Sequence, residues 1–142
     1  MVIKQLSVSL DNVPGTLSTI SEILGREGVN IRAISVADTS DISTVRFVVD
    51  DPEKGKNILV GNGHTPKETD VLAVEIPDHP GAMNAVLKPL KAAGINVHYL
   101  YPHLGRIGKN AIVILGVDKT DDAQATLAQN WVKTLGREVY NV

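Results

Sequence analysis

The chain has 142 residues, a formal net charge of −2 and an isoelectric point near 6.0. This length allows one ordinary domain or two very small ones. A mildly acidic chain has no general attraction for phosphate backbones, and one Phe, one Trp and three Tyr are few for stacking on bases. The composition therefore argues against nucleic acid as a partner.

The sequence contains no cysteine, which excludes disulfides, thiol catalysis and thiolate metal sites. No apolar run approaches the roughly 20 residues that span a bilayer. Strand-like sequence begins at Ile3, directly after the start methionine, so we expect no signal peptide. These features predict a cytoplasmic protein that does not bind membranes.

One segment of the chain occurs twice. Pro14 and Pro80 are 66 residues apart, and so are Asn30 and Asn96. Each proline precedes a glycine and opens a stretch with helical apolar spacing, and each asparagine follows the glycine that ends that stretch. The repeat fills the chain and leaves no room for a separate catalytic domain.

Two units are therefore expected, at residues 1–68 and 69–142. A domain of this size buries only about 60% of its unfolded surface and is marginally stable alone. We accordingly expect the two units to pack together.

The first repeat predicts the order strand, helix, strand, strand, helix, strand. The expected elements are a strand at 3–10, a helix from Pro14 to Gly28, hairpin strands at 30–36 and 43–49, a helix from Asp51 to Gly61 or Gly63, and a closing strand near 65–68. The next strand, at 71–76, follows too closely for a flexible linker.

The second repeat predicts the same order, with a hairpin loop about two residues longer. Its expected elements are a helix from Pro80 to Gly94, hairpin strands at 97–101 and 110–117 around a loop with Pro102, Gly105 and Gly108, a helix capped by Thr120 with Leu127, Trp131 and Leu135 on one face and its end at Gly136, and a closing strand at 137–140.

The segment 111–117 is apolar on both faces of its expected strand. A strand in a two-layer domain normally exposes one face, so a second layer must cover this one. Burial by the sister repeat and an oligomer interface are both compatible with the pattern.

The two Pro-Gly turns are the first candidates for function. Each lies between the end of a strand and the start of a helix, where backbone N–H groups and the helix dipole attract an anion such as a carboxylate. Gly15 and Gly81 would let a small ligand approach the backbone. Asn30 and Asn96 could offer their amides to the ammonium and carboxylate groups of a ligand, although an asparagine tolerated in a tight corner explains either one alone.

This pattern of strand, Asp-x-x-Pro-Gly-x-Leu, helix and Gly-Val-Asn-Ile resembles the ACT domain, a regulatory module of amino-acid metabolism. The resemblance covers the whole chain as two copies, similar to freestanding tandem ACT proteins. It implies two ferredoxin-like βαββαβ units, an α+β fold with antiparallel sheets and helices on one face, and amino-acid binding near the turns at an interface between domains. The ligand-binding residues that it implies are Asp11, Asn12, Val13, Pro14, Gly15, Thr16, Leu17, Asn30, Ile31, Asp78, His79, Pro80, Gly81, Ala82, Met83, Asn96 and Val97.

The two turns differ, since the second is one residue shorter, has His79 before its proline and has Met83 in place of the leucine. The two sites therefore need not share a ligand. The four histidines are scattered and form no metal-ligand spacing. No nucleophile motif or Gly-rich phosphate loop is present, so we expect no enzyme activity, no cofactor and no metal.

The sequence thus predicts a non-catalytic, amino-acid-binding regulatory protein that forms a homodimer. The alternative is an adaptor without a ligand, which docks on a metabolic enzyme. RNA binding on the sheet is a weaker rival, because the strands of the expected sheets carry aliphatic rather than basic and aromatic residues.

Overall fold

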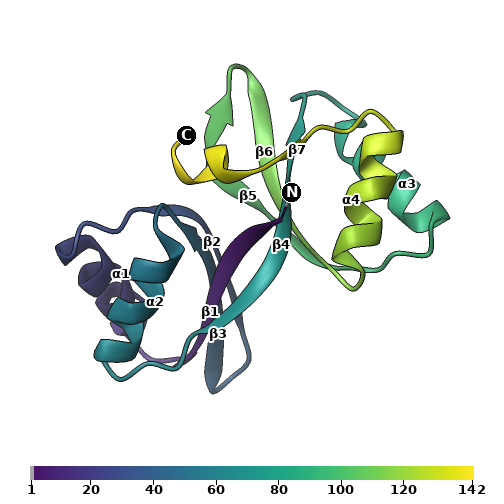
Figure 1. The fold of residues 1–142 in the computed structure, drawn as a ribbon. Coiled ribbons are helices and arrows are strands. Elements are labelled where there is room, and N and C mark those ends of the chain that lie inside the picture. The colour runs from purple at the N-terminus through teal and green to yellow at the C-terminus, as the bar shows by residue number, and fades with distance from the viewer. Residues whose placement is uncertain (1) are drawn as a thin grey trace. The chain divides into compact units, whose positions relative to one another are not determined.

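The computed structural model describes residues 2–142. Its contacts divide the chain into two units that correspond to the two repeats (Figure 1). The first spans Lys4–Thr69, and the second spans Asp70–Val142 and includes Val2 and Ile3. Among the described residues, no helix has the length and apolar character needed to cross a membrane.

The first repeat is a three-stranded antiparallel arrangement with two helices on one face (Figure 1). β3 lies between β1 and β2, with Leu6 opposite Phe47 and Ile34 opposite the same residue on the other side. Its elements are β1 (Ile3–Asp11), α1 (Thr16–Arg26), β2 (Ile31–Asp38), β3 (Ile42–Val49), α2 (Pro52–Gly61) and the start of β4 (Lys67–Ile76).

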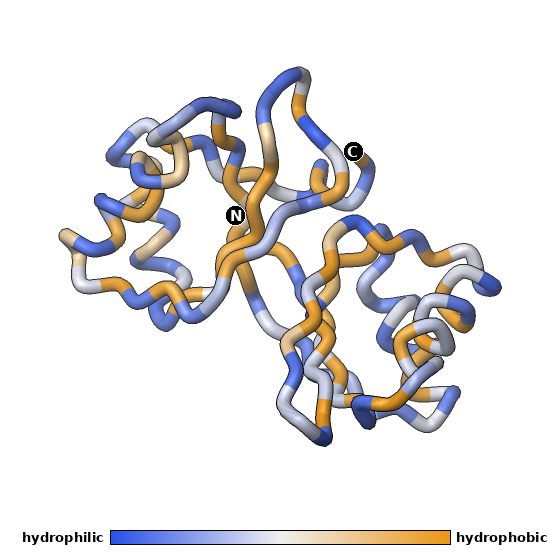
Figure 2. Tube along the Cα trace, turned by 180° about the vertical axis from the view of Figure 1, so that it is seen from behind, coloured by the Kyte–Doolittle hydropathy of each residue, from blue (hydrophilic) through white to orange (hydrophobic). Residues whose placement is uncertain are grey.

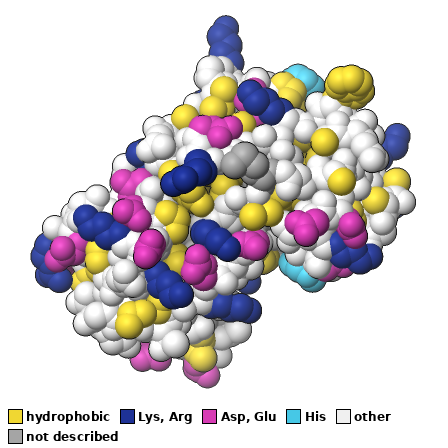
Figure 3. Space-filling view, viewed as in Figure 1, with side chains coloured by type: hydrophobic (Ala, Val, Ile, Leu, Met, Phe, Trp, Pro, Cys, Tyr) yellow, Lys and Arg dark blue, Asp and Glu magenta, His cyan; other side chains and the backbone are white. Residues whose placement is uncertain are grey.

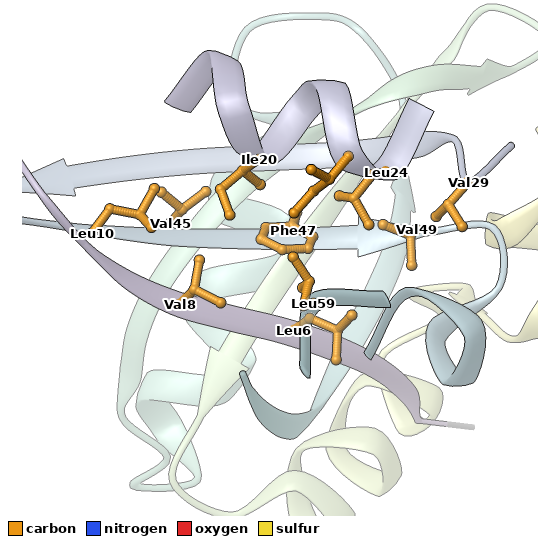
Figure 4. Packing of buried hydrophobic residues seen from close by; sticks show 11 residues of the cluster. Leu6, Val8, Leu10, Ile20, Leu24, Val29, Val45, Phe47, Val49 and Leu59 are labelled. Atoms are coloured by element: carbon orange, nitrogen blue, oxygen red, sulfur yellow. The ribbon is translucent and has the colours of Figure 1, made fainter. Parts of the chain in front are cut away.

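The core of this repeat forms where the apolar alternation of β3 meets the apolar stripe of α1 (Figure 4). Phe47 is fully buried at its centre, against Ile20 and Leu24 of α1 and Leu59 of α2. Each such side chain contributes about 1.5–3 kcal/mol when it is removed from water. Apolar residues follow the strands and the inner helix faces, while turns are hydrophilic (Figure 2).

The second repeat has the same plan, with strand order β5, β6, β4, β7 and both helices on one face (Figure 1). Its core contains Leu72, Val86, Leu90, Leu115 and Leu127. The elements are β4, α3 (Ala82–Ala92), β5 (Val97–Ile107), β6 (Asn110–Val117), α4 (Thr120–Gln129), β7 (Thr134–Leu135) and a 3-10 helix (Arg137–Tyr140). The structure therefore confirms the two βαββαβ units.

The last helix is shorter than the sequence predicts. α4 ends at Gln129, and the N–H groups of Trp131 and Val132 bond back to the carbonyls of Ala128 and Leu127 at 3.3 and 3.0 Å. Trp131 adopts a left-handed backbone (φ 62°) with its side chain 96% exposed, so the predicted apolar stripe through Trp131 is wrong.

Two further details of this helix differ from the expectation. Leu135 is not helical but pairs with Ala73 of β4. The chain must therefore leave the helix and reverse its direction before it reaches Leu135. Thr120 is the first helical residue rather than the cap, and Lys119 at the cap position makes no side-chain hydrogen bond to the helix.

The expected closing strand at 137–140 is a 3-10 helix instead. The buried side chain of His103 holds this helix in place. The predicted hairpin loop is largely strand, because β5 continues to Ile107 and its two extra residues form a bulge between Pro102 and Arg106. His103 in this bulge is buried, and its Nε2 bonds the carbonyl of Val139 at 2.8 Å. The bulge thereby holds the C-terminal turn.

Strand β6 is buried on both faces, as its composition indicated. Val113 and Leu115 belong to the core beneath the helices, and Ile112 and Ile114 on the alternate face are only 1% and 0% exposed. The single chain therefore already covers both faces of this strand.

Candidate ligand-binding site

The two Pro-Gly turns have the same backbone conformation. Gly15 and Gly81 occupy the N-cap positions of α1 and α3 with φ values of 90° and 86°. An L-residue in this left-handed region is strained, which explains glycine at both positions. No side chain caps either helix.

The helices that follow these turns also lack acidic residues in their first turns, unlike the other two α-helices. Asp51 caps α2 by accepting from the Lys54 N–H at 3.1 Å, and Glu53 follows it. α4 has Asp121 and Asp122 in its first turn. Because a helix start carries unpaired N–H groups and a partial positive charge, α1 and α3 each present an uncompensated site for an anion.

The first turn is held by hydrogen bonds to its own repeat. Asn12 binds the loop between β2 and β3, through its N–H to the Asp41 carbonyl at 2.9 Å and through its Nδ2 to the Thr39 carbonyl at 3.1 Å. Thr16 Oγ1 lies 3.0 Å from the carbonyl of Asp11. The amide of Asn12 therefore positions the turn, and one of its two side-chain N–H donors is used for this.

The second turn has a different anchor. Arg106 of β5 forms an ion pair with Asp78 at 3.6 Å, and His79 Nδ1 lies 3.0 Å from the carbonyl of Pro80. Ala82 is buried and Met83 packs against the core. Each of these four predicted residues therefore has a contact within the protein.

The two asparagines lie at the other end of the helices. The N–H of Asn30 donates to Asp50 Oδ1 at 2.9 Å, and the N–H of Asn96 donates to Asp118 Oδ1 at 3.0 Å. The side chains of both asparagines are exposed, whereas the following Ile31 packs against the core. A one-residue bulge follows each asparagine in both repeats.

Helix length separates the turn from the asparagine within each repeat. α1 has 11 residues and rises about 16 Å along its length, with Gly15 before its start and Asn30 beyond its end. α3 also has 11 residues, with Gly81 and Asn96 beyond its two ends. A single small ligand therefore does not reach both predicted contacts of one repeat.

Predicted site residues line cavities in both repeats of the described chain. One of about 310 Å³ lies beside the first turn and is lined by Ser9, Leu10, Asp11, Thr16, Thr19 and His64. Another of about 440 Å³ lies at the far end of α3 and is lined by Leu87, Lys91, Gly94, Ile95, Asn96 and Val97.

Three polar residues of the first cavity were not among the predicted site residues. Ser9 and Thr19 could have been found, since Ser9 alternates with Asp11 on β1 and Thr19 lies one turn after Thr16. His64 comes from the loop after α2, and no sequence pattern places it near the turn.

Charges are mixed on the visible surface, where basic and acidic side chains alternate without a broad single-sign patch (Figure 3). Within residues 2–142, no group of three His, Asp or Glu side chains is arranged to hold a metal ion. The cavities and turns are thus the features that suit a small ligand.

Comparisons with known proteins agree with this architecture. A family model described as an ACT domain pair matches residues 1–138. A crystal structure of a protein from Bacteroides thetaiotaomicron shares 31% identity and a TM-score of 0.93, over 100% of this chain and 98% of that one. No curated protein matches the chain significantly.

More distant structures show the same fold. The ligand-free regulatory subunit of aspartate kinase from Thermus thermophilus is 14% identical with a TM-score of 0.64, over 90% of this chain and 92% of that one. A structure of aspartokinase alpha and beta subunits is 15% identical with a TM-score of 0.61, over 90% and 91%. The repeated fold and the full-length family match show that the chain belongs to the family of ACT domain pairs.

Proposed function

We propose that this protein is a non-catalytic regulatory protein that binds an amino acid at its Pro-Gly turns. The observation that carries the proposal is the contrast between the helices, since α1 and α3 begin without a cap or an acid while α2 and α4 begin with acids. The carboxylate of an amino acid would compensate the exposed N–H groups at these two helix starts.

Regulation would follow from linkage. A ligand that binds the turns stabilises whichever arrangement of the protein holds them in the binding conformation, and it shifts the population towards that arrangement. The fold similarity to the regulatory subunit of aspartate kinase from Thermus thermophilus supports a role of this kind. The homodimer and the cytoplasmic location remain predictions from the sequence.

A thermal-shift screen against the twenty amino acids at millimolar concentration tests the proposal. A ligand at about 100 times its Kd adds about 2.7 kcal/mol of stability. For a chain of this size, that corresponds to a rise in Tm of about 5–10 °C. A shift confined to one or a few amino acids is expected, and a flat panel would contradict the proposal.

Asn30 and Asn96 remain proposed ligand contacts of their own, at the far ends of the helices. Ligand affinity of the variants Asn30→Ala and Asn96→Ala tests whether these side chains contact the ligand. Both side chains are exposed and can be removed without breaking the backbone bonds to Asp50 and Asp118. An unchanged affinity in the double variant would remove both asparagines from the site.

A second candidate is the adaptor without a ligand, which docks on a metabolic enzyme. The 96% exposed Trp131 favours it, because tryptophan is enriched at interfaces and this one has a strained backbone without being buried. Co-purification of an enzyme that depends on Trp131, with no amino-acid effect on stability, is the result expected of an adaptor.

A further inference from the structure

We propose that the cavity beside the first turn binds the ammonium group of the ligand, and that the second turn does not. This turn cavity is lined by Ser9, Leu10, Asp11, Thr16, Thr19 and His64 and has a volume of about 310 Å³. That size is at the lower end of the range for small-molecule sites, about 300–1,000 Å³. The inference deepens the proposed function and rests on it.

The two threonines of the turn cavity present acceptors to a ligand. Thr16 Oγ1 donates its proton to the carbonyl of Asp11 (3.0 Å) or Val13 (3.2 Å), and Thr19 Oγ1 donates to the carbonyl of Gly15 at 2.9 Å. A hydroxyl has a single proton, so only its lone pairs remain for a ligand. Both threonines therefore favour a hydrogen-bond donor.

Asp11 adds a negative charge, which is opposite in sign to that of an ammonium group. Asp11 is one of the residues that line the same cavity, and an ionised carboxylate only accepts hydrogen bonds. Among residues 2–142, no ion pair or side-chain hydrogen bond is found for this carboxylate. One carboxylate and two threonine oxygens match the three N–H donors of a primary ammonium group, and charge-assisted bonds of this kind are the stronger ones.

His64 is placed at the cavity by the end of α2. Gly63, in the left-handed region at φ 84°, donates to the carbonyl of Val60 at 3.1 Å, and the His64 N–H donates to the carbonyl of Leu59 at 2.9 Å. These two bonds make a Schellman motif anchored on a fully buried leucine. The backbone of His64 is therefore held at the cavity, where its half-buried imidazole can discriminate between ligand side chains.

The second repeat replaces every one of the hydroxyl and imidazole groups. Ala82 and Ala85 stand 66 residues after Thr16 and Thr19, and Val132 closes the Schellman motif of α4 as His64 closes that of α2. The position of Ser9 is taken by Glu75, whose carboxylate is bound by Asn110 at 2.7 Å and lies 3.6 Å from the Lys133 ammonium. The second turn therefore lacks the two hydroxyls and the imidazole of the first, although the buried Oε1 of Glu75 has no hydrogen-bond partner among the described residues.

Fragment binding followed by NMR tests the inference on the full-length protein. Ethylammonium chloride supplies the ammonium group alone and sodium propionate the carboxylate alone, with potassium chloride keeping the ionic strength constant. Ethylammonium should shift the amide signals of Thr16, Thr19 and His64 in a saturable way and leave those of Ala82 and Val132 unchanged. Equal shifts in both repeats, or none in the first, would overturn the inference.

The propionate arm reports on the proposed function independently. Propionate should shift the first-turn amides of both α1 and α3, since both helix starts lack acids. If ethylammonium shifts the amide signals and propionate does not, the anion site at the turns is contradicted. If propionate shifts them and ethylammonium does not, only the ammonium cavity is contradicted.

Three variants separate the acceptors from general charge effects. Asp11→Asn and Thr19→Val should each weaken ethylammonium binding roughly tenfold, because the first replaces a charged acceptor by a neutral amide and the second removes a hydroxyl, both at nearly constant volume. Asp38→Asn, an exposed residue outside the cavity, is the matched charge control and should leave binding unchanged. Equal weakening by Asp11→Asn and Asp38→Asn would show a diffuse electrostatic effect and would refute the site.

Discussion

Asp50 accepts a hydrogen bond from the backbone N–H of Asn30 at 2.9 Å, and the Asp50 N–H donates to the Asn30 carbonyl at 3.0 Å. This two-way clamp joins the start of β2 to the end of β3. The second repeat reproduces it between Asp118 and Asn96, at 3.0 and 3.2 Å. The repeated asparagines are thus tied to repeated aspartates through backbone groups, whatever their side chains bind.

We predict that Asp50→Ala and Asp118→Ala each lower the free energy of unfolding by about 1–3 kcal/mol, the usual effect of losing a hydrogen bond to a charged group. Urea unfolding followed by circular dichroism measures the loss. Asp50→Asn keeps an acceptor at the same place and should lose less. Equal losses for Asp50→Asn and Asp50→Ala would contradict the clamp.

His103→Ala should loosen the C-terminal turn. The substitution deprives the Val139 carbonyl and the Gly105 N–H of their partner, and each buried group left unsatisfied costs about 1–3 kcal/mol. Faster amide exchange at residues 139–141 is the expected readout. The exposed His98 on the same strand is the control, and comparable exchange in His98→Ala would argue against the role of His103.

Gly116→Ala should displace an aromatic side chain. An added Cβ would overlap the ring of Tyr99, which stacks against Tyr101 with ring centroids 6.3 Å apart. Overpacking of this kind costs about 1–3 kcal/mol, and near-UV circular dichroism should report the moved tyrosine. Gly61→Ala meets no atom within 4 Å at the end of α2 and should be neutral or stabilising by up to about 1 kcal/mol. A stabilising Gly116→Ala would contradict the packing.

Trp131→Gly should leave the fold intact and stabilise it by up to about 1 kcal/mol. Trp131 and Gly63 occupy the same left-handed position after their helices, and only glycine takes that conformation without strain. Since the indole is 96% exposed, its emission in the native wild-type protein should already match that of indole in water. Blue-shifted emission that moves to the red on unfolding would contradict this exposure.

Most of the fold was predictable because the sequence signals are local and repeated. Alternating apolar residues on β3 and the spacing of Ile20 and Leu24 on α1 are period-2 and period-3.6 patterns that occur wherever one face is buried. The Asp51-Pro52 start of α2 also formed as predicted, with the expected cap.

The largest errors lie in the last third of the chain, where tertiary contacts override local preference. Leu127, Trp131 and Leu135 have helical spacing, yet Leu135 is drawn into a pairing with Ala73 that no local pattern reveals. The C-terminal turn likewise depends on His103, which lies 36 residues away from Val139. Long-range pairing of this kind is outside the reach of periodicity.

The candidate site was predictable only in part. The Pro-Gly turns could be located because a positive φ at Gly15 demands a particular residue type. Whether one ligand can contact both the turn and Asn30 depends on the distance between the two ends of α1, and the residue spacing in the sequence does not give that distance directly. His64 reaches the turn cavity only through the packing of α2 beside α1.

The most direct measurement is isothermal titration of the best amino acid from the screen into wild type and into the Ser18→Asp/Asn84→Asp variant. Both positions are exposed in the first turns of α1 and α3, so the new acids should stabilise each helix by about 0.3–1 kcal/mol while competing with the ligand carboxylate. Ser21→Asp/Asn57→Asp makes the same charge change outside those turns and serves as the control. The account predicts a more stable first-turn variant that no longer binds, beside a control that binds normally. Unchanged binding by the first-turn variant would contradict the central claim that the ligand carboxylate lies at the Pro-Gly turns.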